Sequence, residues 1–82
     1  MLVILHKDAK KHYKRLPRVE QKKIQKKLLQ LVKEPLAGKL LEGDLAGSRS
    51  IRAWPYRIIY RVNQNLKRVE VSVILHRQGA YK

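Results

Sequence analysis

The spacing of apolar residues changes once along this chain, and this change is its most informative feature. Between residues 9 and 32 the apolar side chains recur every three or four positions, as on one face of a helix. Between residues 56 and 76 they alternate with other side chains, as in a strand with one buried face. The sequence therefore predicts helices first and consecutive strands afterwards, which is an α+β order.

Two predicted helices follow a short apolar segment. Leu2–Leu5 is expected to form a strand in the centre of the sheet, because it is apolar on both faces. Asp8 is the expected N-cap of the first helix, and Pro17 separates this helix from a second one over residues 18–33. Pro35 ends the second helix. The residues expected to face the core are Ala9, Tyr13, Leu16, Ile24, Leu28 and Leu31, widened by Leu29 and Val32.

A loop over residues 36–48 leads to three predicted strands at 50–54, 56–62 and 68–76. The expected core face of the last two strands comprises Tyr56, Ile58, Tyr60, Val62, Val69, Val71, Val73 and Leu75. The expected opposite face comprises Arg57, Ile59, Arg61, Glu70, Ser72, Ile74 and His76. We therefore expect one α+β domain over residues 1–82: a strand, a helical hairpin and a three-stranded antiparallel meander, with the helices on one face of the sheet.

The charge balance points to a polyanionic partner. The 20 lysines and arginines outnumber the 6 acidic residues, which gives a formal net charge of +14. The predicted helices carry many of these charges, and their expected phosphate contacts are Lys10, Lys14, Lys22 and Lys26. No apolar run is long enough to span a membrane, and the histidine spacing predicts no metal site. The absence of cysteine fits a reducing cytoplasm.

The face of the sheet away from the helices is expected to be open and rich in cations. Arg57, Arg61 and His76 are predicted to lie on it. The residues expected to flank it are Arg49, Arg52, Arg77 and Tyr81. Guanidinium groups bind phosphate in a bidentate manner, so Arg49, Arg61 and Arg77 are expected to contact RNA phosphates. A histidine or tyrosine can transfer a proton. Such a face could cleave RNA without a metal or other cofactor, by attack of a ribose 2′-hydroxyl on the adjacent phosphate.

The segments that carry this chemistry resemble a known family. The segment 52–62, RAWPYRIIYRV, and the segment 76–81, HRQGAY, are similar to the motifs of the RelE/ParE superfamily of bacterial and archaeal toxins. Residues 40–47 also resemble the loop that precedes the family's second strand. The resemblance covers almost the whole chain and includes the order of helices and strands.

This resemblance implies a toxin of a type II toxin–antitoxin system. RelE-like members cleave mRNA in the ribosomal A site and are inhibited by a cognate antitoxin. The implied catalytic residues are Arg57 on the scissile phosphate, Arg52 in support, His76 or Arg77 as acid or charge, and Tyr81 against a base. The basic helices would bind ribosomal RNA through its phosphates.

One departure from the family pattern leaves alternatives open. Some members carry two lysines where this chain has Ser48 and Ser50, so no general base is assigned, and Glu42 or Asp44 could serve only if the loop folds back. ParE-like members share the fold and target DNA gyrase without enzymatic activity. A gyrase inhibitor, a weakened toxin remnant and a plain nucleic-acid-binding module therefore remain alternatives.

Overall fold

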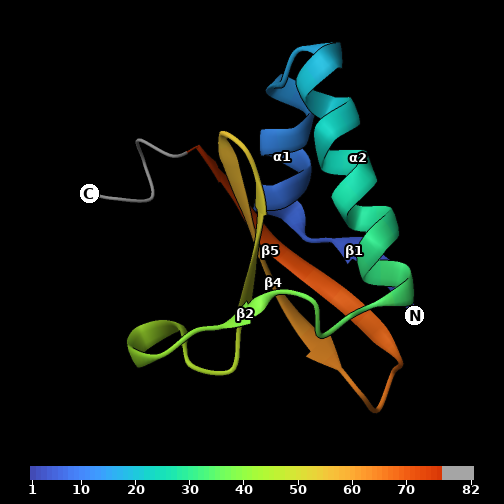
Figure 1. Cartoon of the computed structure of the whole chain (residues 1–82), viewed down its shortest axis with the longest axis vertical. Coiled ribbons are helices and arrows are strands. Elements are labelled where there is room, and N and C mark those ends of the chain that lie inside the picture. The colour runs from blue at the N-terminus through green and yellow to red at the C-terminus, as the bar shows by residue number, and fades with distance from the viewer. Residues whose placement is uncertain (77–82) are drawn as a thin grey trace.

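A computed structural model describes residues 1–76 of the chain and confirms the expected α+β fold (Figure 1). Two helices cover one face of a five-stranded sheet with the strand order β1-β5-β4-β3-β2. Strand β1 runs parallel to β5, and the other neighbouring strands are antiparallel. The elements are β1 (Leu2–Leu5), α1 (Lys7–Arg15), α2 (Arg18–Lys33), β2 (Lys39–Leu40), the 3₁₀ turn η1 (Gly43–Leu45), β3 (Arg49–Ala53), β4 (Tyr56–Asn63) and β5 (Arg68–His76).

The helical hairpin has the predicted boundaries but one unexpected start. Pro17 is the N-cap of α2. A backbone N–H at this end of a helix has no partner within the helix, so a proline can stand there without loss of a hydrogen bond. Helix α1 begins at Lys7 with His6 as its N-cap, so the prediction of Asp8 as N-cap is wrong. Asp8 lies instead in the first helical turn, where its negative charge interacts favourably with the positive end of the helix dipole.

The core lies between the two helices and the sheet. Ala9, Ile24 and Leu31 are its buried helical residues, as predicted. The buried sheet residues are Ile51, Ala53, Ile58, Tyr60, Val69, Val71 and Ile74. Leu29 and Val32 are exposed to 67% and 39%, so they do not widen the core stripe of α2 as expected.

Two parts of the sheet differ from the prediction. Strand β1 lies at one edge of the sheet and not in its centre, because it pairs only with β5 among the described strands. At the opposite edge the predicted loop contains β2, whose two residues pair with β3 through Lys39 opposite Ser50 and Leu40 opposite Arg49. Each of these two edges borders a hollow on the surface.

A β-bulge reverses the faces of the last strand. Val71 lies opposite Tyr60 and Val73 lies opposite Ile59, so Ser72 has no partner across the ladder. Beyond this extra residue the alternation is inverted, and Ile74 is buried in the core at 4% exposure. The predicted assignment of Val73 and Leu75 to the core face, and of Ile74 and His76 to the other face, is therefore wrong.

Candidate functional site

Two arginines lie directly opposite each other on the sheet face that the helices do not cover. Arg52 of β3 pairs with Arg57 of β4 in the ladder, and paired residues project from the same face of a sheet. Like charges in this position repel each other and destabilise a sheet. Their juxtaposition favours a role in binding an anion.

These arginines line a hollow of about 180 Å³, which we call the cationic hollow. Its other lining residues are Lys39, Leu41 and Ser50. Three cationic side chains and one hydroxyl thus border the hollow, and none of its lining residues is acidic. The site has the charge and the hydrogen-bond donors that bind a phosphate group.

Lys39 was not predicted from the sequence. It reaches the hollow because β2 pairs with β3 and brings Lys39 beside Ser50. Ser50 stands where some members of the family that the sequence resembles carry a lysine, and here a lysine from the neighbouring strand lies next to that serine. A two-residue strand leaves no periodic signal, so only the fold reveals this neighbour.

Buried hydrogen bonds fix the segment that carries Lys39. The Tyr60 hydroxyl donates to the Pro35 carbonyl at 2.9 Å and accepts from the Gly38 backbone N–H at 2.8 Å. Arg49 donates to the Gly38 carbonyl at 3.0 Å. Burial raises the pKa of Tyr60, although the Gly38 hydrogen bond and the Arg49 charge act in the opposite direction. A Cβ atom at Gly38 would lie only 2.5 Å from the Tyr60 hydroxyl, so this position requires glycine.

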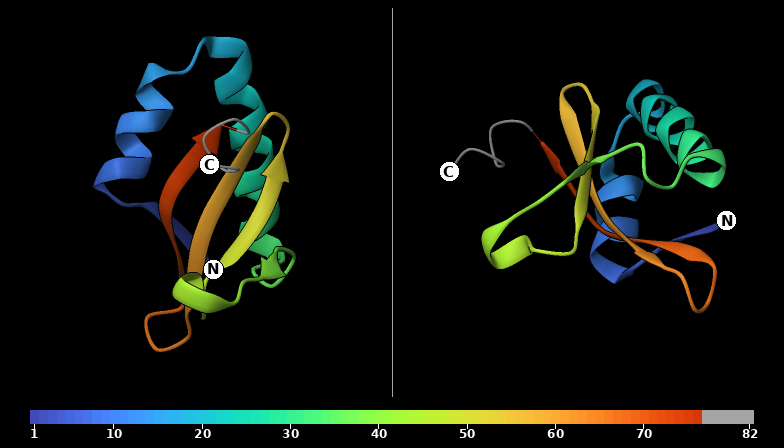
Figure 2. Two further views of the ribbon diagram at one scale, coloured as in Figure 1. Left: turned by 90° about the vertical axis from the view of Figure 1, so that its left-hand side faces the viewer. Right: turned by 60° about the horizontal axis from the view of Figure 1, so that its bottom comes forward.

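Arg61 fastens the loop that precedes β3. Its guanidinium donates to the Ser48 hydroxyl and to the Ala46 carbonyl, both at 3.1 Å. The loop between them turns at Gly47, whose φ of +89° suits glycine. In Figure 1 and in the right view of Figure 2, η1 lies beside the sheet on the side away from the helices. Arg61 and Arg49 were predicted to contact phosphate, and the structure gives both of them protein partners.

His76 lies on the other face of the sheet. It is opposite Tyr56 in the ladder, and the two rings meet edge to face with centroids 5.3 Å apart. It borders a separate hollow beside α1, together with His12 and Arg15. The predicted placement of His76 beside Arg57 is therefore wrong, because the bulge at Ser72 inverts the strand. Arg77 and Tyr81 lie outside the described residues.

The remaining predicted residues are dispersed. Neither Glu42 nor Asp44 lines the cationic hollow. The predicted phosphate-binding lysines Lys10, Lys14, Lys22 and Lys26 are exposed on the two helices. Within residues 1–76, no cluster of three or more histidine or acidic side chains could hold a metal ion. In the same part of the chain, neither helix is long and apolar enough to cross a membrane.

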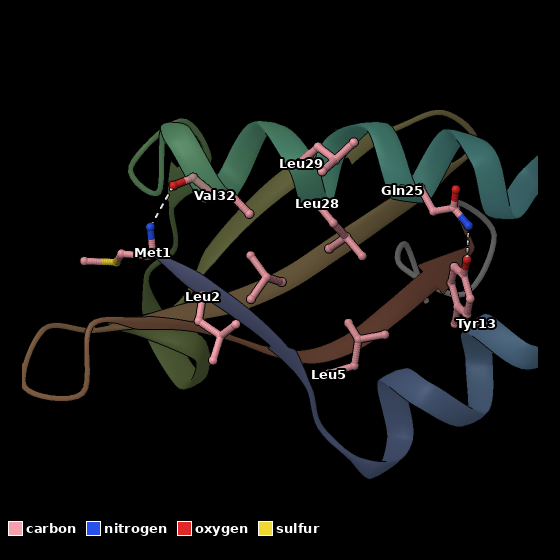
Figure 3. Close-up of a pocket in the computed structure, with 9 residues that line it drawn as sticks. Met1, Leu2, Leu5, Tyr13, Gln25, Leu28, Leu29 and Val32 are labelled. Atoms are coloured by element: carbon pink, nitrogen blue, oxygen red, sulfur yellow. Dashed lines mark hydrogen bonds between the residues drawn. The ribbon is translucent and has the colours of Figure 1, made fainter.

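An apolar groove of about 660 Å³ lies between β1, α1 and α2 (Figure 3). Leu2 and Leu29 face it with 66% and 67% of their surface exposed. At one end the Met1 nitrogen donates to the Val32 carbonyl, and at the other Gln25 donates to the Tyr13 hydroxyl (Figure 3). A groove this apolar on the surface of a small protein is typical of a protein-binding site.

Comparison with known proteins reveals the family. The family model described as ParE toxin of type II toxin-antitoxin system, parDE, matches residues 3–81. The RelBE2 toxin–antitoxin complex of Mycobacterium tuberculosis is similar, with a TM-score of 0.85 and 29% identity over 93% of this chain and 96% of that chain. The YoeB/ParE toxin of Agrobacterium tumefaciens gives 0.81 and 26%, over 93% of this chain and 98% of that chain.

An archaeal protein is also similar to this chain. The RelE–RelB complex of Pyrococcus horikoshii OT3 has a TM-score of 0.78 and 26% identity, over 93% of each chain. No curated protein matches the chain significantly. The family model covers nearly the full sequence, and the matched folds share the helical hairpin on a mixed sheet. The chain therefore belongs to the RelE/ParE superfamily of type II toxin–antitoxin toxins.

Proposed function

We propose that this toxin is a ribosome-dependent endoribonuclease that cleaves mRNA at the cationic hollow. The observation that carries the proposal is the direct opposition of Arg52 and Arg57, with Lys39 beside them. A gyrase inhibitor that acts by binding alone has no need of a site built for one phosphate. Ribosome and mRNA are both cytoplasmic, so the proposed site of action is the cytoplasm.

In the proposed reaction the ribose 2′-oxygen attacks its own 3′-phosphate. The new O2′–P bond forms as the P–O5′ bond breaks, the hydroxyl proton is lost, and O5′ takes up a proton. The products are a 2′,3′-cyclic phosphate and a 5′-hydroxyl end. Arg52, Arg57 and Lys39 would stabilise the negative charge that develops on the phosphate oxygens. The proposed step does not use His76, because this residue lies on the opposite face of the sheet.

Primer extension on an mRNA under translation in a purified system tests the proposal. The protein should produce cuts within the reading frame when ribosomes are present and none when they are absent. Arg57→Ala should slow these cuts about 100- to 1,000-fold, because one donor to the transition state is lost. The matched control is Lys67→Asn, which removes one charge in the β4–β5 turn and suits the φ of 50° there. Equal rates for the wild type and Arg57→Ala would overturn the proposal.

The second candidate function is inhibition of DNA gyrase without catalysis. The specific observation in its favour is the family model, which is named for ParE toxins. A DNA supercoiling assay separates the two functions. Inhibited supercoiling with intact mRNA would support gyrase inhibition. If the protein neither inhibits supercoiling nor cleaves mRNA, it is an inactive toxin remnant.

We also propose that a cognate antitoxin covers the apolar groove. The M. tuberculosis and P. horikoshii relatives were solved as toxin–antitoxin complexes. The groove would take the apolar side of an amphipathic antitoxin segment, and the net charge of +14 favours acidic residues on its flanks.

A further inference from the structure

A second basic hollow lies around the only tryptophan of the chain. Trp54 occupies the turn between β3 and β4 and exposes 56% of its surface. It borders a hollow of about 450 Å³, which we call the tryptophan hollow. The other lining residues are Lys23, Lys26, Lys27, Arg52 and Ala53. Helix α2 thus supplies three lysines and the hairpin supplies a large aromatic ring.

The charges in this hollow are mostly uncompensated. Lys23 forms an ion pair with Glu20 at 3.1 Å on the same helix. Lys26, Lys27 and Arg52 form no ion pair within residues 1–76. A shallow site with three cations outside any ion pair in the described part of the chain, and with an exposed aromatic ring, is suited to an anion that also carries a flat ring system.

The two hollows are neighbours. Arg52 lines both of them. Strand β2 pairs with β3 only at Arg49 and Ser50, so Ile51–Ala53 form an edge of the sheet. The Arg52 side chain therefore stands at this edge, with the cationic hollow on one side and the tryptophan hollow on the other. A chain bound in one hollow can continue past Arg52 into the next.

We infer that the tryptophan hollow binds single-stranded RNA adjacent to the phosphate that is cleaved. One base stacks on the Trp54 ring, and Lys26 and Lys27 contact the flanking phosphates. This assignment rests on the proposed function, since it takes RNA as the substrate. An acidic peptide would pair with the lysines, but it has no planar group for the exposed indole, so RNA accounts for both features of the hollow.

The single tryptophan supplies a direct measurement. A short 2′-O-methyl RNA strand, which cannot be cleaved, should quench the fluorescence of Trp54 as it binds. The same strand with an abasic nucleotide at each position in turn should fail to quench at one position. The absence of RNA quenching, or equal quenching by a poly-glutamate peptide, would overturn the inference.

Variants separate stacking from charge. Binding of a labelled strand, followed by anisotropy, should weaken about 5- to 100-fold in Trp54→Ala and much less in Trp54→Phe. Lys26→Ala with Lys27→Ala should reduce the slope of log K against log salt by about 1.4, since two phosphate contacts are lost. Lys67→Asn, which removes one lysine charge away from the hollow, is the control for the general loss of a positive charge and should change this slope little. Circular dichroism melts verify that each variant is folded, and unchanged affinity in folded Trp54→Ala would contradict the stacking.

The inference and the proposed function fail in different ways. If RNA quenches Trp54 but mRNA is not cleaved in the translated system, RNA binding at the tryptophan hollow is supported and the nuclease function is rejected. If Trp54→Ala cleaves mRNA at the wild-type rate at every RNA concentration, the nuclease function is supported and RNA binding at the tryptophan hollow is rejected. Arg57→Ala should lose cleavage while its tryptophan is still quenched.

Discussion

Arg52 and Arg57 are the residues at which the proposed activity would come at the expense of stability. Arg52 is exposed and lies across the ladder from Arg57, so the two guanidinium groups repel each other in the free protein. A bound phosphate would turn this repulsion into shared attraction.

Arg52→Gln should reveal this trade-off. Removal of one opposed charge is expected to leave the free energy of unfolding unchanged or to raise it by about 0.2–1 kcal/mol. The same change should slow mRNA cleavage at least about 10-fold, because one phosphate donor is lost. Urea denaturation and primer extension measure the two effects. A variant that is less stable by more than about 1 kcal/mol would show that Arg52 is structural.

Tyr60 gives a residue-scale prediction about pH. Burial raises the pKa of its phenol, so the folded protein holds this proton more tightly than the unfolded chain does. The stability that Tyr60 supplies is complete below about pH 10, where the unfolded phenol begins to ionise, and it is lost as pH rises further.

Tyr60→Phe is the comparison that isolates this effect. At neutral pH the variant should be less stable by about 1–2 kcal/mol, because the hydrogen bonds to Pro35 and from Gly38 are lost. The difference from the wild type should shrink above about pH 10. Urea denaturation at several pH values measures it, and lysine titration cancels in the comparison. A constant difference up to pH 11 would contradict the buried ionisation.

At the scale of secondary-structure elements, the bulge in β5 decides which side chains share a face. Strict alternation from Val71 would bury Val73 in the core and place Ile74 on the other face. In the structure Ile74 is in the core and Val73 is half-buried on the other face. The extra residue at Ser72 also separates His76 from Arg57. One inserted residue therefore changes the membership of the proposed active site.

A pair of alanine substitutions tests the inverted alternation. Ile74→Ala should lower the free energy of unfolding by about 2–5 kcal/mol, because Ile74 is 4% exposed in the core. Val73→Ala should cost much less, since Val73 is half-buried on the other face. Thermal and urea denaturation rank the two variants. A larger loss for Val73→Ala would mean that the strand has no bulge.

The periodicity of the sequence predicted the helices and the long strands, but not the bulge in β5 or the short strand β2. The helical stripes and the alternation in β4 are repeated signals, so the helical hairpin and the meander could be derived from them. The bulge at Ser72 and the two-residue strand β2 involve one or two residues each and leave no repeat. For this reason Arg52 and Arg57 were predicted as site residues, whereas Lys39 was missed and His76 was placed on the wrong face.

On the scale of the whole molecule, the apolar groove and the cationic hollow lie at opposite edges of the sheet. The apolar groove borders β1, and the cationic hollow borders β2 and β3 at the other end of the strand order. An antitoxin segment in the groove would leave the hollow uncovered unless a further segment reached it. Binding of the antitoxin and cleavage of RNA are therefore expected to depend on different residues.

Leu29→Gln tests this separation. Leu29 is 67% exposed in the groove, and glutamine is a good helix former, so the stability of the free toxin should change little. Affinity for the cognate antitoxin should fall about 10-fold or more, because an apolar anchor of the proposed interface would be lost. Calorimetry measures the affinity, and co-expression measures whether growth arrest is still reversed.

The control for Leu29→Gln is Val19→Gln. Val19 is 69% exposed on the same helix but does not line the groove, so its replacement should leave the antitoxin affinity as it is. Primer extension provides the second comparison, since cleavage by purified Leu29→Gln should match that of Val19→Gln. Equal antitoxin affinities for the two variants would show that the antitoxin binds elsewhere. A loss of cleavage in Leu29→Gln alone would instead mean that the groove and the cationic hollow are coupled across the sheet.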